Sequence, residues 1–496
     1  MLTLTPFVAT FAQVTDDEKE TMQTFFTNSL NGKSGTYSAN RAIDNNQIAA
    51  VRAQVWEEWR NSVNNFDEEK LIPIGWLEDR NTGSWTLPSN LEPNATMPYY
   101  WGANTSSADE INDNSKFPLF LYMHGSGDKA SEWETGIGLA LRRFYSPGVY
   151  MVPQIPNGYG EYYRWAIQSK QWAWEKLLRL SFLEDKIDPN RIYFFGISEG
   201  GYGSQRLAAF YADYLAGAGP MAGGEPLKNA PMENVANIAF SLRTGALDEM
   251  FLRNRMTEEA LAVADSLEAE HPGYYKHFIE VIPDYGHSID YKPTTPWLAQ
   301  FTRNPHPKYV YWENFDMYGR YRKTFYNIKV NKTSRENSAQ RSCYEMSIDN
   351  NTITLNVKNV RYKTTYTSGG IEFLFSKSYT EATLGNITLY LNEELFDLEK
   401  PVKVILNGTE IFNERVGADL ATMVESCALF YDPERVFPAA IEVDIASKSA
   451  QATSVKSVVE KKNDKKGAKY NVSGQVINTP SSGQIYINNG KKYLAE

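Results

Sequence analysis

The stretch Ile192-Tyr-Phe-Phe-Gly-Ile-Ser-Glu-Gly-Gly201 decides the fold, because an apolar run leads straight into a G-x-S-x-G pentapeptide centred on Ser198. Residues 191–195 are β-branched and aromatic over the length of a buried strand, and apolar residues within 203–215 recur at helical spacing. Gly196 and Gly200 lack a Cβ, so a strand and a helix can approach closely around a strained serine. The pattern predicts a strand–turn–helix that presents the Ser198 hydroxyl.

A serine hydroxyl becomes a good nucleophile when a base takes its proton, and histidine is the usual base. The chain has five histidines. His287 lies beside Gly286 in a loop after the strand-like run 277–283, which is where a base belongs in this architecture. His124 precedes the serine in the chain, on another strand, and is expected to be structural. We therefore predict His287 as the base.

The base needs a carboxylate that fixes its tautomer and stabilises the imidazolium. The strand-like run 235–242 breaks into a loop that contains Asp248. Asp248 gives the chain order Ser, Asp, His, so it is the predicted acid. Glu249 is the second candidate and Asp284 the third. The alternative is that Asp248 only caps a helix that begins near Glu249.

A glycine-rich turn upstream is the candidate oxyanion hole. The apolar strand 116–123 is followed by His124-Gly-Ser-Gly127, and such a turn can aim backbone N–H groups at a developing oxyanion. The expected donors are the N–H of Glu199, just after the nucleophile, and one N–H at Gly125 or Ser126.

Together these motifs resemble a known family. Residues 72–310 are similar to secreted α/β-hydrolase esterases of the polyhydroxybutyrate-depolymerase and feruloyl-esterase type. The matching residues are His124-Gly-Ser-Gly127, Asp188-Pro-Asn-Arg-Ile-Tyr193, Gly196-Ile-Ser-Glu-Gly-Gly201, Gly219-Pro-Met-Ala-Gly-Gly224, Asp248 and Gly286-His287. The resemblance covers about half of the chain and implies hydrolysis of carboxylic esters through an acyl-enzyme. The acidic Glu199 departs from the residue types that many relatives carry there, which leaves substrate choice open.

Length and charge narrow the function classes. A chain of 496 residues predicts two or three domains. The net charge of −10 comes with no evident basic face, so we expect no nucleic-acid partner. No run approaches the roughly 18 apolar residues that span a bilayer. Residues 1–13 resemble the end of a signal peptide, with small residues before a cleavage point after Ala12 but no basic start. Export is therefore predicted, to the medium, the periplasm or the cell surface.

Two cysteines, Cys343 and Cys427, follow the hydrolase region and lack metal-ligand spacing. The two cysteines could form a disulfide across one sheet, or both could be buried free thiols. We predict neither a metal nor a cofactor.

The predicted fold is a mostly parallel α/β-hydrolase sheet flanked by helices, followed by an antiparallel β-sandwich-like domain. The β-rich part has no nucleophile–base pair, and we favour a structural brace over sugar binding for it. The expected segments are a signal-peptide remnant (1–13), a helical leader (14–71), the hydrolase (72–307), the β-rich domain (308–445), a flexible linker (446–469) and a short tail motif (470–496).

Aromatic residues near the expected cleft suggest the substrate. Trp133, Trp165 and Tyr202 are the candidate substrate contacts, because flat aromatic faces can stack on a sugar or a phenolic acyl group. The sequence thus predicts a serine esterase acting on acylated carbohydrate, of feruloyl or acetyl type. The alternatives are a serine peptidase with the same triad and a non-catalytic carbohydrate-binding protein.

Overall fold

The computed structural model describes residues 14–112, 116–156 and 164–454, and of the C-terminal segment residues 469–471, 476–477, 482, 485–488 and 491–494. The chain forms two compact units, Met1–Thr453 and Ser454–Glu496. The predicted signal-peptide remnant and residues 455–468 of the predicted linker lie outside the described residues. Within the described part, no helix has both the length and the apolar character needed to cross a membrane.

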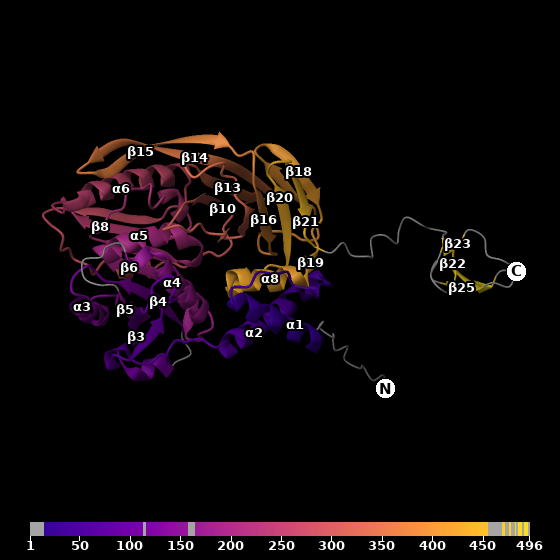
Figure 1. The fold of residues 1–496 in the computed structure, drawn as a ribbon, viewed down its shortest axis with the longest axis horizontal. Helices are drawn as coiled ribbons and strands as arrows, with labels where there is room; N and C mark the ends of the chain where they lie inside the picture. The colour runs from indigo at the N-terminus through magenta and orange to yellow at the C-terminus, as the bar shows by residue number, and fades with distance from the viewer. Residues whose placement is uncertain are drawn as a thin grey trace, which may run out of the picture. The chain divides into compact units, whose positions relative to one another are not determined.

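The hydrolase region is built around an eight-stranded sheet with the strand order β2-β3-β5-β4-β6-β7-β8-β9 (Figure 1). The first two pairings are antiparallel and all others are parallel. The strands are β2 (Thr82–Thr86), β3 (Thr96–Asn104), β4 (Phe117–Met123), β5 (Gly148–Pro153), β6 (Ile187–Ile197), β7 (Gly217–Met221), β8 (Ala239–Gly245) and β9 (His277–Ile282).

Helices cover both faces of this sheet. Successive strand residues point to opposite sides, so each strand contributes side chains to two cores. On β4, Leu119 and Leu121 join one core while Phe120 and Tyr122 join another. Helices α4 (Gln168–Ser181), α5 (Glu199–Tyr211) and α6 (Arg253–Glu270) contribute to the first core. Helices α3 (Lys129–Arg142) and α7 (Thr294–Leu298) contribute to the second. The predicted α/β-hydrolase fold is confirmed.

The β-rich region forms two further sheets, in the orders β10-β13-β14-β17-β18, with β15 paired to β14, and β11-β12-β16-β20-β21. All pairs are antiparallel except β14 with β17. Apolar residues of both sheets belong to the same core cluster as the hydrolase. The strands are β10 (Tyr309–Asn314), β11 (Thr324–Phe325), β12 (Ile328–Lys332), β13 (Arg341–Asp349), β14 (Thr352–Ser368), β15 (Ile371–Glu381), β16 (Asn386–Leu391), β17 (Val402–Leu406), β18 (Thr409–Glu414), β20 (Ala439–Asp444) and β21 (Ser449–Ala452).

Two features of this region differ from the sequence-based expectation. Helix α8 (Leu420–Phe430) interrupts the predicted run of strands, capped by the Asp419 carboxylate, which accepts from Thr422 N at 2.8 Å. Strand β21 lies where the flexible linker was expected to begin, because its backbone pairs with β20.

The two cysteines are free and buried. Cys427 lies on α8 and Cys343 on β13, so the reading of a disulfide across one sheet does not hold. Burial raises the pKa of the Cys343 thiol to about 12, which keeps it protonated and unreactive.

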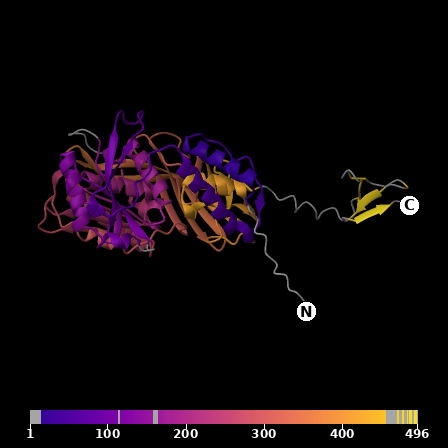
Figure 2. The same ribbon diagram turned by 90° about the horizontal axis from the view of Figure 1, so that it is seen from below.

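The helical leader packs against helix α8 of the β-rich region. Helices α1 (Asp16–Leu30) and α2 (Ile48–Asn65) lie beside α8 (Figure 2). Strand β1 (Ala42–Ile43) pairs with β19 (Ala418–Asp419). The apolar face of α2 is buried at Ile48, Val51, Val55 and Trp59. Its helical neighbours include α8, which comes from the other end of the chain.

The second unit contains a four-stranded antiparallel sheet at the predicted short tail motif. Its strands are β22 (Lys469–Asn471), β23 (Val476–Ile477), β24 (Ile485–Asn488) and β25 (Lys491–Leu494).

Candidate active site

Ser198 lies between β6 and α5 with φ 56° and ψ −114°, a conformation that non-glycine residues rarely adopt. Close approach of the neighbouring backbone holds it there. A Cβ on Gly200 would fall 1.9 Å from the carbonyl oxygen of Met123, and one on Gly196 would fall 2.5 Å from the backbone of Gly200. Only glycine fits at either position. The neighbouring backbone can therefore pass close to the turn, where Ser198 keeps a strained conformation that points its hydroxyl outward.

His287 joins Ser198 to Asp248 in a chain of hydrogen bonds. The Nε2 of His287 lies 3.0 Å from Ser198 Oγ, and its Nδ1 lies 2.7 Å from Asp248 Oδ2. Asp248 follows β8 and is buried, whereas the imidazole is half-exposed. The three side chains predicted as a triad are therefore together. Of the candidate acids, it is Asp248 whose carboxylate meets the imidazole.

Arg253 fixes the other oxygen of the same carboxylate. Its Nη1 donates to Asp248 Oδ1 at 2.9 Å, and both side chains are less than a tenth exposed. The guanidinium lies over the rings of Tyr202 and Phe251, at 5.7 and 5.1 Å from their centroids. Sequence reasoning missed Arg253. Its position at the start of α6, five residues after the acid, was the available signal.

The glycine-rich loop after β4 lies beside the serine, as expected, but one of its amides is engaged. Gly125 N donates to Glu132 Oε2 at 3.2 Å, so Gly125 is not available as an oxyanion donor in this arrangement. The cause is helix α3, which begins at Lys129 and brings the Glu132 side chain back over the loop. Ser126 and Glu199 line the cavity next to Ser198.

His124 is structural, as predicted. Its ring is fully buried, with Nδ1 2.7 Å from Gly125 O and with Nε2 accepting from Ile155 N at 3.1 Å. These contacts require the proton on Nδ1. The ring therefore braces the loop that carries Gly125.

Two of the three predicted aromatic contacts do not line the cavity. Trp165 is fully buried, and its indole N–H donates to His124 O at 2.9 Å. Trp133 stacks on Tyr100 with ring centroids 4.2 Å apart and donates to Val152 O at 2.7 Å. Both indoles satisfy backbone groups of the fold, which corrects their assignment as substrate contacts. Tyr202 does line the cavity.

The triad opens into a cavity of about 540 Å³. Its outer wall is apolar: the side chains of Met250 and Phe251 are 66% and 52% exposed. Phe251 and Leu252 have φ of 57° and 60°, two successive left-handed residues in the loop after the acid. Strain of this kind persists where the surrounding structure imposes it, often at functional sites.

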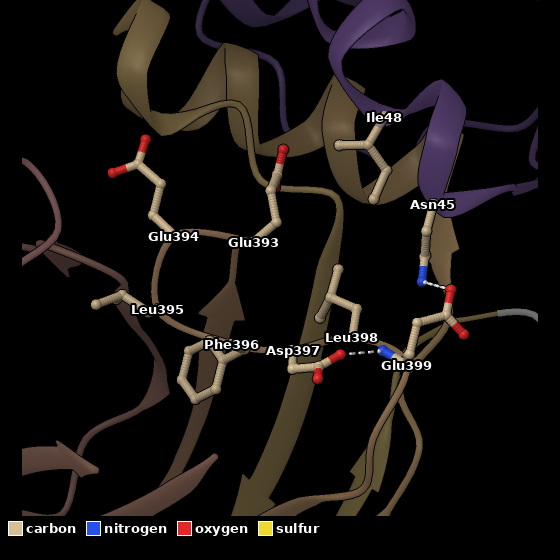
Figure 3. Close-up of a pocket in the computed structure, with 9 residues that line it drawn as sticks. All are labelled: Asn45, Ile48, Glu393, Glu394, Leu395, Phe396, Asp397, Leu398 and Glu399. Carbon is tan, nitrogen blue, oxygen red and sulfur yellow. Dashed lines mark hydrogen bonds between the residues drawn. The ribbon is translucent and has the colours of Figure 1, made fainter. Parts of the chain in front are cut away.

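A separate hollow contains no triad residue (Figure 3). It is lined by Asn45, Ile48 and the acidic loop 393–399. The carboxylates there already have partners: Glu399 accepts from Asn45 Nδ2 at 2.6 Å, and Glu393 pairs with Arg52 at 2.7 Å. Over the described ranges, His, Cys, Asp and Glu side chains form no group of three that could hold a metal ion.

Comparison with known proteins agrees with the resemblance read from the motifs. No protein-family model matches the chain. The chain is 30% identical over 149 residues to poly(3-hydroxyalkanoate) depolymerase C of Paucimonas lemoignei, across 28% of this chain and 33% of that protein. The matched part thus spans about a third of the relative.

Solved structures of esterases are also similar to part of the chain. A thermostable esterase is 20% identical at a TM-score of 0.36, covering 46% of this chain and 64% of that one. A ferulic acid esterase is 14% identical at a TM-score of 0.33, covering 44% and 97%.

Proposed function

We propose that this protein is a serine hydrolase of carboxylic esters and that its substrates are acylated carbohydrates. The observation that carries the proposal is the hydrogen-bonded chain Ser198–His287–Asp248, with the serine strained on a strand-to-helix turn at the floor of a cavity. The similarity to a poly(3-hydroxyalkanoate) depolymerase, a protein named for splitting a polyester, supports ester chemistry.

The geometry supports the following reaction. Ser198 Oγ attacks the ester carbonyl carbon while His287 Nε2, 3.0 Å away, takes the hydroxyl proton. The imidazolium is stabilised by Asp248, whose second oxygen is held by Arg253. The backbone N–H groups of Glu199 and Ser126 receive the oxyanion.

Collapse of the tetrahedral intermediate breaks the bond between the carbonyl carbon and the alcohol oxygen. His287 gives its proton to the departing alcohol, which leaves an acyl group on Ser198. A water molecule then attacks the acyl-enzyme with His287 as base, and the acid is released with the serine restored.

The proposed acyl site is the apolar wall formed by Met250 and Phe251, because exposed apolar side chains beside a nucleophile gain most by covering an apolar acyl group. Export, read from residues 1–13, remains part of the proposal.

The test uses the purified full chain with p-nitrophenyl acetate, methyl ferulate, acetylated xylobiose and dipeptide anilides. Ser198→Ala and His287→Ala are expected to lower kcat on esters by about a thousandfold or more, with little change in stability. The matched control is His277→Ala, because His277 also pairs with an aspartate, Asp265 at 3.1 Å, but lies outside the cavity.

Hydrolysis of the anilides without hydrolysis of esters would instead support a peptidase. Full ester activity in Ser198→Ala would remove the triad from the mechanism. Binding of saccharide with no turnover of any ester would favour a carbohydrate-binding protein.

A further inference from the structure

The β14–β15 hairpin extends beyond the sheet to which it belongs. Strand β13 pairs with β14 only from Thr352 to Val360, so residues 361–368 have β15 as their one strand partner among the described strands. This two-stranded ribbon lies over α6 of the hydrolase region (Figure 1). A two-stranded ribbon is marginally stable by itself, so its position depends on what holds it to the hydrolase.

Three cations hold the ribbon in place. Lys228 pairs with Glu372 at 2.9 Å and also lies over the ring of Phe375. Arg255 of α6 lies 5.0 Å from the ring centroid of Phe373 and 5.5 Å from that of Tyr366. Lys377 of the ribbon pairs with Glu233 at 2.6 Å. The ribbon is therefore clamped along its length, and each clamp joins it to the hydrolase region.

The clamped ribbon closes one side of a second hollow, of about 200 Å³. Ile371, Glu372 and Phe375 form this side, and the hydrolase region supplies the rest. Tyr202 and Phe251 line both this hollow and the cavity over Ser198, so the two spaces share a wall.

We propose that this second hollow is a saccharide subsite of the active site, with one wall built by the β-rich region. A sugar ring of the ester's alcohol part would lie between Phe375 and the hydrolase wall while the acyl group occupies the cavity over Ser198. The inference rests on the proposed ester hydrolysis and deepens it.

The charged side chains that line the hollow are paired with opposite charges. Glu225 is buried and accepts from Arg206 Nε at 2.7 Å, from Arg206 Nη2 at 3.0 Å and from Asn229 Nδ2 at 3.0 Å. On the ribbon side, the Glu372 charge is balanced by Lys228. Each carboxylate has its cation, so the hollow offers no net charge and favours a neutral ligand.

The hollow is lined both by aromatic rings and by hydrogen-bond acceptors, a combination that suits a sugar ring. Phe251 and Phe375 supply flat faces for the C–H side of the ring. Glu372 accepts from Lys228 Nζ and from Thr364 Oγ1, whereas an ionised carboxylate offers about four acceptor positions. The remaining positions are open to sugar hydroxyls, and the carbonyl oxygen of the Asn229 side chain is a further acceptor.

The test compares two esters of the same acid, acetylated xylobiose and p-nitrophenyl acetate, so that the acyl group is constant. In Phe375→Ala, the ratio of kcat/KM on the saccharide ester to kcat/KM on p-nitrophenyl acetate is expected to fall about tenfold. Asn229→Ala, on the opposite wall, should lower the same ratio without altering the ribbon. Tyr379→Ala is the matched control, since it removes an aromatic ring on the same strand outside the hollow.

An unchanged ratio in both Phe375→Ala and Asn229→Ala, with folded variants and Ser198-dependent hydrolysis of p-nitrophenyl acetate, would overturn the subsite alone. A wild-type protein that hydrolyses no ester would instead overturn the proposed function. If Phe375→Ala lowers turnover of methyl ferulate relative to p-nitrophenyl acetate but spares the saccharide ester, the hollow takes a phenolic acyl group and the saccharide assignment is wrong.

Discussion

Replacing Asp213 by asparagine should destabilise the protein strongly, because this carboxylate is the centre of a buried charge cluster. It accepts from Arg322 at 2.5 and 3.0 Å and from Arg435 at 2.7 Å. Arg435 continues to Asp432 at 2.8 Å, and Asp432 pairs with Arg303 at 2.6 Å. All five side chains are less than a tenth exposed. The cluster joins Asp213 and Arg303 of the hydrolase region to three residues of the β-rich region.

The magnitude follows from the charge count. Three guanidinium groups face two carboxylates in the native protein, and they would face one in Asp213→Asn. The amide keeps the shape but leaves Arg322 without its anion, and Arg435 must then share Asp432 with Arg303. Breaking a buried ion pair on one side costs about 3–5 kcal/mol, a large part of the roughly 5–15 kcal/mol that holds a typical domain folded.

The measurement is urea unfolding followed by tryptophan fluorescence, with the denaturant midpoint and slope compared between variants. Asp213→Asn should lower the midpoint with little change in slope. Glu381→Gln is the control, because its ion pair with Lys448 is exposed on both sides and should contribute nothing measurable. A loss below about 1 kcal/mol in Asp213→Asn would refute the reasoning, since it would mean that water or another group compensates the arginines.

Two further predictions concern pH and the acid of the triad. Burial, with Arg303, Arg435 and Arg52 nearby and Asp432 opposing them, lowers the pKa of His306 from 6.5 to about 4. As the pH falls, the unfolded chain therefore binds this proton before the folded protein does. The contribution of His306 to the free energy of unfolding should be fully present above pH 6.5 and fall by about 3 kcal/mol as the pH drops towards 4. In urea titrations across that range, His306→Gln should remove this part of the pH dependence, and a variant with the same pH dependence as the wild type would contradict the prediction. Arg253→Met should lower kcat on p-nitrophenyl acetate about tenfold with a smaller change in KM, because Asp248 loses the hydrogen bond that orients it. An unchanged kcat would mean that Arg253 contributes only to packing.

The sequence predicted the triad because each member is marked by local chemistry. Gly196 and Gly200 identify a turn that no other residue fits, and Asp248 and His287 each follow a strand in the expected order. The apolar spacing indicated a helix within 203–215, and the glycines after Ser198 carry no side chain that could extend this pattern. In the structure the helix begins at Glu199, directly after the strained serine.

Positions that depend on packing between distant segments could not be read in this way. Trp165 follows a glycine-rich stretch and looked like a substrate contact, yet its indole N–H is used to hold His124 O. Helix α8 is capped by Asp419, a residue type that favours this position, but the strand-like segments on both sides hid it. The ion pair between Lys228 and Glu372 joins residues 144 apart in sequence, and no local pattern predicts such a contact.

These long-range contacts fix the β-rich region to the hydrolase. The hydrolase and the β-rich region share one apolar core, and the N-terminal helices close that core against α8. The buried cluster around Asp213 then fixes the junction, because moving either region would separate charges that have no access to water. The ribbon has separate contacts with the hydrolase region, through Lys228 with Glu372 and Lys377 with Glu233. A wall of the proposed saccharide subsite can therefore come from a region that has no catalytic residue of its own, and the Phe375→Ala ratio measures its contribution.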